Sequence, residues 1–197
     1  MALRIMSGFS APWYVAGGWA LDMFLNRVRR PHYDLDIVVF RRDQVELHEH
    51  LSQDWPLLKV TEDSEGHHRV PWKRGEWLEL PVFQVVLKVN EADGTNEIEV
   101  LLSETEGDQW FHRDFVNVRK SLPEVGMMSH TGVPYLAPEI VLFYKSKPVP
   151  PQGRINGEKD QADFAETQPY LNAEQRAWLH RMLQERYGDN HHWLDKL

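Results

Sequence analysis

Two glycines and two aspartates, separated by a short helical stretch, constrain this chain more than any other part of its sequence. The glycines, Gly17 and Gly18, follow an apolar run over residues 13–16 that is typical of a buried strand. Glycine adopts positive φ angles without cost and lets another group approach the backbone closely. A helix that begins after such a turn offers free backbone N–H groups to an anion. We therefore expect phosphate to bind at Gly17, Gly18 and the helix start at Trp19.

The two aspartates follow that helix, which we expect to end at Pro31 because proline stops a helix. Residues two apart on a strand share a face, so Asp34 and Asp36 point the same way while the apolar residues beside them point into a core. Two such carboxylates repel each other unless a cation bridges them. They could simply flank a turn, but Mg²⁺ is held in proteins by one or two carboxylates plus substrate phosphates. With the glycine turn at the same edge, the pattern predicts a site for a metal-bound nucleoside triphosphate.

The stretch GGWALDMFLNRVRRPHYDLDIVV resembles the nucleotidyltransferase superfamily with the DNA polymerase β-like fold. Within that superfamily it resembles the aminoglycoside 2″-adenylyltransferase group and its uncharacterised relatives, densely over residues 13–44 and more loosely over 132–183. The resemblance implies an α/β (α+β) fold, in which a small mixed, mainly antiparallel sheet has flanking helices and a helical C-terminal part. We expect a catalytic domain over residues 1–131 and the helical part over 132–197.

The resemblance also implies a third acid on a neighbouring strand, which acts as a base and sometimes as a metal ligand. The family form, apolar-Asp-apolar-apolar-Leu, is matched by Glu99 within the strand predicted over 97–102. Asp34, Asp36 and Glu99 are therefore the implied catalytic and Mg²⁺-binding residues. Glu97 shares the face of Glu99 and is the alternative third acid. An ordinary exposed strand acid remains the structural alternative.

Basic residues between the helix and the acidic strand match the family pattern R-x-x-R-x-H-x-D-x-D at Arg27, Arg30 and His32. The resemblance implies that they orient the acids or contact phosphate. The alternative is a solvated helix end, where cations meet the C-terminal dipole.

Two lysines in the C-terminal part also match the family. Lys145 lies on a helix predicted from Pro138, and Lys159 begins a Lys-Asp-x-x-Asp motif that implies a contact with the triphosphate. The acids of that motif, Asp160 and Asp163, would hold a lysine or arginine in place, or simply favour a helix start. The residues expected to bind the nucleotide are thus Gly17, Gly18, Trp19, Arg30, His32, Lys145 and Lys159.

Other segments give local expectations. We expect a short leader over residues 1–12, a helix over 42–55 with His48 and His50 on its surface, and a polar loop with the solvated His67 and His68. A strand over 82–89 should turn through a hairpin loop over 90–96. A mobile Pro/Gly-rich loop should span 148–157, a helix 173–187 and a surface extension 188–197.

Composition limits the partners. The 197 residues carry a net charge of −8, which disfavours non-specific nucleic-acid binding and attracts cationic small molecules. The absence of cysteine excludes thiolate chemistry and fits the cytoplasm, and no apolar run is long enough to span a membrane. We expect ATP or another nucleoside triphosphate, Mg²⁺ and a small aminoglycoside-like acceptor. RNA or protein as acceptor, or a nucleotide-binding module without turnover, are the alternatives.

Overall fold

The computed structural model describes residues 1–91, 94–147 and 155–197. Within those ranges ten strands form one sheet, in the order β4-β3-β5-β6-β2-β1-β10-β9, with β7 beside β6 and β8 beside β7. The strands are β1 (Trp13–Val15), β2 (Leu35–Phe40), β3 (Leu57–Asp63), β4 (Gly66–Pro71), β5 (Gln84–Glu91), β6 (Gly94–Glu106), β7 (Gln109–His112), β8 (Phe115–Ser121), β9 (Gly126–Met128) and β10 (Pro134–Leu136).

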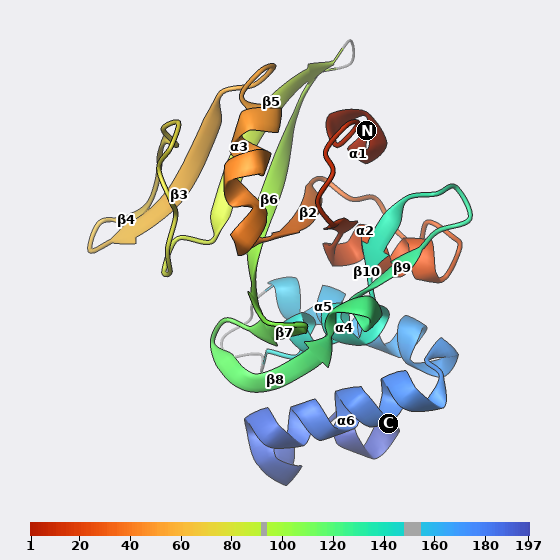
Figure 1. The fold of residues 1–197 in the computed structure, drawn as a ribbon. Helices are drawn as coiled ribbons and strands as arrows, with labels where there is room; N and C mark the ends of the chain where they lie inside the picture. Colours follow the sequence, from red (N-terminus) through yellow and green to blue (C-terminus); the bar gives the residue numbers. More distant parts are fainter. Residues whose placement is uncertain (92–93, 148–154) are drawn as a thin grey trace.

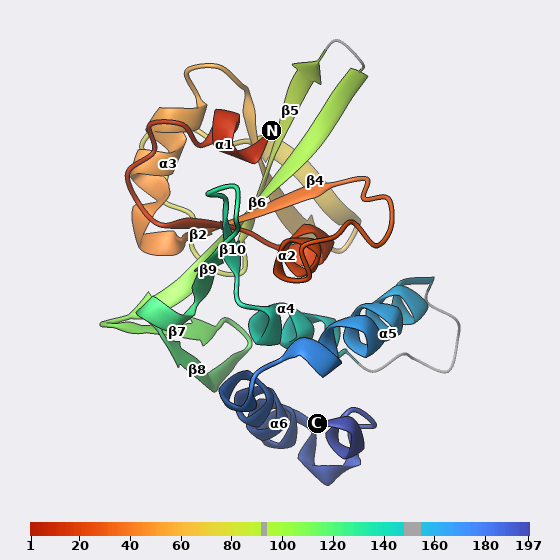
Figure 2. The ribbon, with the colours of Figure 1, turned by 90° about the vertical axis from the view of Figure 1, so that its right-hand side faces the viewer.

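The α-helices of the described residues are α1 (Ala2–Ile5), α2 (Gly17–Phe24), α3 (Gln44–Leu51), α4 (Pro138–Lys145), α5 (Ile155–Thr167) and α6 (Ala173–Tyr187). Helix α3 contacts β2, while α4, α5 and α6 gather beyond the far end of the long strand β6 (Figure 1). Turning the molecule shows α2 beside α4 and α5 (Figure 2). Short 3₁₀ turns complete the described chain at Arg41–Asp43, Leu122–Glu124, Gln168–Tyr170, Gly188–Asn190 and Leu194–Lys196.

The sheet is mixed but mainly antiparallel. Among the described strands, β2 pairs with β6 and β1 pairs with β10 in parallel, and the other pairings are antiparallel. The predicted fold class, a mixed sheet with flanking helices and a helical C-terminal part, is confirmed. The boundary predicted after residue 131 falls between β9 and β10, which form a hairpin within the sheet.

Alternation along β2 separates a core face from a site face. Ile37 and Val39 are fully buried, as is Val100 on the neighbouring strand β6. In the β2–β6 register Ile37 lies beside Val100, and Asp36 lies beside Glu99. Because the side chains of paired residues point to the same side of a sheet, Asp36 and Glu99 share the face opposite this core.

The helix after the glycines ends earlier than predicted. Helix α2 stops at Phe24, and Asn26 takes a positive φ of 52°. Asparagine tolerates this left-handed conformation, which commonly ends a helix. Asp22 then accepts a hydrogen bond from the backbone N–H of Arg29 at 3.3 Å and so holds the chain as it folds back. Pro31 lies beyond the helix and does not end it.

Three predictions about histidines were wrong. His67 and His68 lie in strand β4 rather than in a loop. His48 is buried on α3, with its Nε2 atom 3.1 Å from the carbonyl oxygen of Trp72. His50 is half-buried, and its Nε2 atom lies 2.9 Å from the carbonyl oxygen of Ile5. Polarity predicted surface positions for His48 and His50, but backbone carbonyl groups give both rings partners inside the fold.

Both ends of the chain pack into the molecule. Ile5 and Phe9, in the segment expected as a leader, belong to the buried core. The tail predicted as a surface extension instead buries Trp193 completely, and its ring stacks on Phe164 with ring centroids 4.0 Å apart. The tail therefore helps to fix α5 against the rest of the C-terminal part.

Most other elements match their predictions to within a few residues. The helix predicted over 42–55 is the shorter α3, the strand over 82–89 is β5, and the strand over 97–102 is the longer β6. The helix predicted over 173–187 has those bounds. Of the two predicted loops, residues 92–93 and 148–154 lie outside the described residues, and 155–157 form the first turn of α5. No helix in the described ranges is long and apolar enough to cross a membrane.

Candidate active site

The site is built around Asp36, which rests directly on Gly17. Gly17 has a positive φ of 61°, and a Cβ atom at this position would overlap the Asp36 carboxylate. The backbone oxygen of Asp36 also accepts a hydrogen bond from the Ala16 N–H at 2.9 Å. The glycine turn, where we predicted phosphate binding, thus contacts the Asp36 carboxylate, because only glycine leaves room for it.

Three acids surround this point. Asp36 is half-buried, Asp34 is exposed just before β2, and Glu99 is half-buried beside Asp36 on β6. Burial first, and then repulsion by Asp34 and Glu99, raises the pKa of Asp36 from 3.8 to about 7. Burial and repulsion by Asp34 likewise raise the pKa of Glu99. Like charge nearby therefore disfavours the ionised forms of both Asp36 and Glu99.

Glu97, the alternative third acid, has different partners. Its two carboxylate oxygens accept hydrogen bonds from Arg69 at 2.7 and 2.9 Å, and Lys88 lies 3.7 Å away. The hydrogen bonds from Arg69 lower the pKa of Glu97. Its charge is thus already balanced, while the charges of Asp36 and Glu99 are not.

These acids suit Mg²⁺ by their chemistry. Carboxylate oxygens are its preferred protein ligands, and an uncompensated cluster of negative charge is relieved by a cation. Across residues 1–91, 94–147 and 155–197, no three His, Cys, Asp or Glu side chains stand close enough to hold a metal by themselves. Two carboxylates with substrate phosphates suffice for Mg²⁺, and Asp34 and Asp36 are the pair that the sequence predicts.

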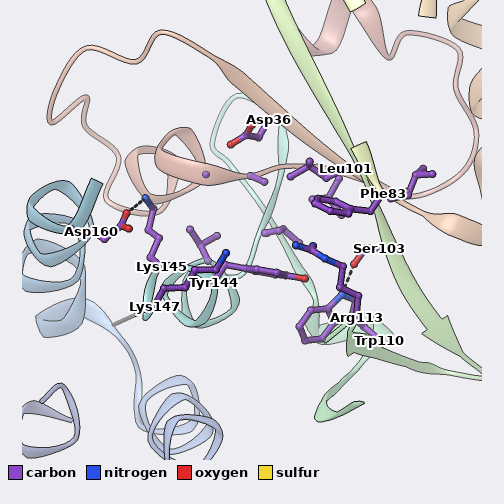
Figure 3. A pocket seen from close by; sticks show the side chains of 17 residues that line it. Asp36, Phe83, Leu101, Ser103, Trp110, Arg113, Tyr144, Lys145, Lys147 and Asp160 are labelled. Carbon is purple, nitrogen blue, oxygen red and sulfur yellow. Dashed lines mark hydrogen bonds and ion pairs between the residues drawn. The ribbon is translucent and has the colours of Figure 1, made fainter. Parts of the chain in front are cut away.

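A cavity of about 380 Å³ opens beside Asp36. Figure 3 shows Asp36 above it, Lys145 reaching toward Asp160 on one side, and Phe83 with Arg113 on the other. Its walls combine aromatic and aliphatic side chains with three cations, which are Arg113, Lys145 and Lys147. Such a cavity fits a ligand with an anionic part and an apolar, flat part.

Lys145 is the cation with the strongest anchoring. Its Nζ atom lies 2.7 Å from Asp160 and 2.9 Å from Asp163. Burial alone would lower the pKa of Lys145, but the attraction of Asp163 and Asp160 outweighs it and raises the pKa. The two acids of the Lys-Asp-x-x-Asp motif thus hold a lysine in place, as one of the alternatives expected, but that lysine is Lys145 rather than Lys159.

Asp163 continues this network toward α2. It is fully buried and also pairs with Arg29 at 2.8 Å and with Arg30 at 3.3 Å. Arg29 in turn pairs with Asp22 at 2.5 Å, and both side chains are only 3% exposed. A chain of buried ion pairs therefore joins the cavity lysine on α4 to the helix that begins at Gly17.

The remaining expected nucleotide residues lie in two places. Arg30 and His32 pack on Gly18, where a Cβ atom would overlap the His32 ring and approach the Arg30 guanidinium. The Nε atom of Arg30 is buried without a hydrogen-bond partner among the described residues. The Trp19 side chain bonds to the backbone of Asp34. Lys159 is exposed on α5 and does not line the cavity.

Sequence reasoning gave no role in the site to Asp22, Arg29 or Arg113. An acid in the middle of the apolar stretch GGWALDMFL was a signal for Asp22, since a charge there needs a buried partner. Arg113 lines the cavity and contacts an aromatic ring. Its guanidinium lies over the Phe83 ring, 3.6 Å from the centroid, in the cavity wall.

The model of the family described as Aminoglycoside-2″-adenylyltransferase matches residues 2–167. The chain belongs to this family. It is a nucleotidyltransferase, and the predicted membership is confirmed. A comparison with curated proteins finds no match.

Solved structures share this fold. The solution structure of the antibiotic-resistance factor ANT(2″)-Ia has a TM-score of 0.55 at 16% identity, covering 99% of this chain and 94% of that one. The crystal structure of ANT(2″)-Ia in complex with adenylyl-2″-tobramycin has a TM-score of 0.60 at 17% identity, covering 94% of both chains. The lincomycin-bound lincosamide antibiotic adenylyltransferase LnuA has a TM-score of 0.54 at 13% identity, covering 86% of this chain and 94% of that one. At these identities the likeness shows the fold.

The contact between Gly17 and Asp36 in this nucleotidyltransferase can be tested with a matched glycine. Gly8 also has a positive φ, of 84°, but a Cβ atom there meets nothing within 4 Å. Gly17→Ala and Gly8→Ala should both lose about 1 kcal/mol of stability from the strained backbone. Only Gly17→Ala should also lose nucleotidyl transfer, by at least about tenfold, because it displaces Asp36. Equal activity in the two variants, at equal stability, would show that the Asp36 position is not critical.

Proposed function

We propose that this enzyme transfers AMP from ATP, with Mg²⁺, to a hydroxyl group of a small cationic, aminoglycoside-like molecule. The observation that carries the proposal is the Asp36 carboxyl. It rests on the glycine turn, repelled by two other acids, at the edge of a cavity that contains an anchored lysine. The description of the family supports the adenylyl group and the class of acceptor.

Acidic side chains lie at one end of the site face and the cationic cavity lies at the other. This separation of charge supports separate binding sites for the two substrates. On β6 the residues that share the face run from Glu97 through Glu99 to Leu101 and Ser103, and the last two line the cavity. The cationic, partly aromatic cavity suits a nucleotide, with phosphates near Lys145 and the nucleoside between the apolar walls. The end of this face with Asp34 and Glu99 suits a cationic acceptor, as does the net charge of −8.

The chemistry follows from this arrangement. An acceptor hydroxyl oxygen attacks the α-phosphorus of ATP, the bond from that phosphorus to the bridging oxygen of the β-phosphate breaks, and pyrophosphate leaves. Glu99, whose pKa is raised by burial and by Asp34, takes the hydroxyl proton. Lys145 neutralises charge on the departing phosphates. Mg²⁺ bound by Asp34 and Asp36 would supply charge stabilisation and alignment of the phosphates.

A pair of isosteric changes separates the two candidate bases. Glu99→Gln should lower kcat by about 10²- to 10⁴-fold, the range for general base catalysis, while nucleotide affinity changes little. If Glu99 is mainly a metal ligand, both should fall. Glu97→Gln is the matched control on the same strand and face, and it should retain kcat because Glu97 is already paired with Arg69. Full activity in Glu99→Gln with loss in Glu97→Gln would exchange their roles.

The acceptor class is tested by following label from ATP that is radioactive at the α-phosphate. We expect label on aminoglycosides in the presence of Mg²⁺, and none on RNA or on protein. Label on RNA or protein instead would replace the proposed acceptor. Nucleotide binding without transfer to any of the three would show a binding module.

A further inference from the structure

The backbones of Asp34 and Asp36, the two proposed Mg²⁺ ligands, are fixed in different ways. Asp36 lies within β2, paired with Glu99 of β6, and its carbonyl group bonds to Ala16. Asp34 precedes β2, which begins at Leu35, and it is exposed. The sheet therefore holds Asp36, whereas Asp34 depends on contacts outside the strand pairing.

Trp19 supplies such a contact. Its indole Nε1–H donates a hydrogen bond to the backbone oxygen of Asp34 at 3.1 Å. The Trp19 ring also packs against His32, with the ring centroids 4.6 Å apart. The first turn of α2 thus uses this side chain to hold the loop that carries Asp34.

His32 and Asp22 hold Trp19 from behind. The His32 side chain is only 2% exposed, and its Nε2 atom lies 2.7 Å from the Asp22 carboxylate. Asp22 also accepts hydrogen bonds from the backbone and side chain of Arg29. A buried carboxylate with these partners cannot turn away without leaving charge unpaired, so the loop keeps one geometry. Gly18 permits it, because a Cβ atom there would overlap His32.

We propose that Trp19 is a positioning residue, which His32 and Asp22 hold in place and which sets Asp34 for binding the metal. The inference rests on the proposed function, in which Asp34 and Asp36 bind Mg²⁺. In this role the Trp19 side chain acts through its hydrogen bond to the Asp34 backbone and does not contact a substrate. Partners that orient metal ligands in this way are typically worth about 10- to 100-fold in metal affinity or activity.

The test measures binding of Mn²⁺ as a probe, from the electron paramagnetic resonance signal of free Mn²⁺, with a non-hydrolysable ATP analogue present. Trp19→Phe keeps the ring but removes the donor to Asp34. We expect it to weaken Mn²⁺ binding about tenfold, while affinity for the analogue without metal stays unchanged. Trp72→Phe is the matched control, because Trp72 also donates from its indole to a backbone oxygen, that of Glu76 at 2.9 Å, outside the site. It should bind Mn²⁺ as the wild type does.

Two further variants keep the outcomes distinct. His32→Gln should also weaken Mn²⁺ binding. If the thermal unfolding curve of Trp19→Phe shows that this variant does not fold, the result with His32→Gln decides whether Trp19 positions Asp34. If Trp19→Phe binds Mn²⁺ as tightly as Trp72→Phe while Asp34→Asn binds it weakly, the positioning role is wrong and the metal site stands. If Asp34→Asn also binds Mn²⁺ normally, the proposed metal site fails, and the inference fails with it.

Discussion

Asp36→Asn should abolish nucleotidyl transfer almost completely while leaving the fold intact. Asparagine keeps the shape that fits over Gly17 but removes the charge that would bind Mg²⁺. Charge stabilisation by a metal is worth several kcal/mol, and each 1.36 kcal/mol is a factor of ten in rate, so we expect kcat/KM to fall by about a thousandfold. Steady-state kinetics with saturating Mg²⁺ measures the loss.

Asp43→Asn is the matched control for that variant. Asp43 is also a half-buried aspartate whose pKa burial raises, but it lies in the 3₁₀ turn after β2 and does not line the cavity. It should retain activity. A loss below tenfold in Asp36→Asn would place the metal elsewhere, and equal losses in both variants would indicate a general effect on folding.

Much of the fold could be predicted because its signals are local. A few consecutive residues are enough to predict the glycine pair, the apolar run of β2 and the long C-terminal helix. The family resemblance then indicated how these elements are arranged in the fold. Pro31 misled the prediction of the helix end, because the chain had already turned at Asn26. That turn depends on Asp22 reaching the Arg29 backbone, a tertiary preference that outweighs the local helix signal.

The site could be predicted only in part, for a related reason. Asp34 and Asp36 are neighbours in the sequence, but the register that brings Glu99 beside Asp36 joins strands far apart in the chain. The ion pairs of Lys145 with Asp160 and Asp163 join two helices in the same way. Sequence reasoning named these residues individually but had no means to tell which lysine the acids would hold. Asp22, which has no place in the acid motif, was missed.

In the metal-free protein, Asp36 should make stability depend on pH. Its pKa is raised from 3.8 in the unfolded chain to about 7 in the folded one. Between these values the unfolded chain loses the proton and the folded one keeps it, so the contribution of Asp36 to stability is lost as pH rises through this range. One pKa unit corresponds to about 1.4 kcal/mol, so the whole shift is on the order of 4 kcal/mol.

His112 works in the opposite direction, so the wild-type curve alone does not isolate this effect. Burial lowers the pKa of His112 from 6.5 to about 4, and its contribution therefore rises with pH over nearly the same range. The quantity to measure is the difference in unfolding free energy between Asp36→Asn and the wild type, by urea unfolding from pH 4 to pH 8. His112 is common to both proteins and cancels. The difference should grow in favour of Asp36→Asn up to about pH 7, the folded pKa, and then level.

Added salt and added metal separate the causes of this difference in unfolding free energy. Added NaCl should reduce the share that comes from Asp34, since that residue is exposed and its repulsion is screened. It should leave the share that comes from burial. Mg²⁺ together with a non-hydrolysable ATP analogue should remove the difference at pH 8 or reverse it, because the bound cation stabilises only the form with the carboxylate. A difference in unfolding free energy that stays constant from pH 4 to pH 8 would mean that the Asp36 carboxyl is neither buried nor repelled as the structure has it. The acid cluster would then have no excess negative charge for a cation to neutralise, and the proposed chemistry depends on that cation.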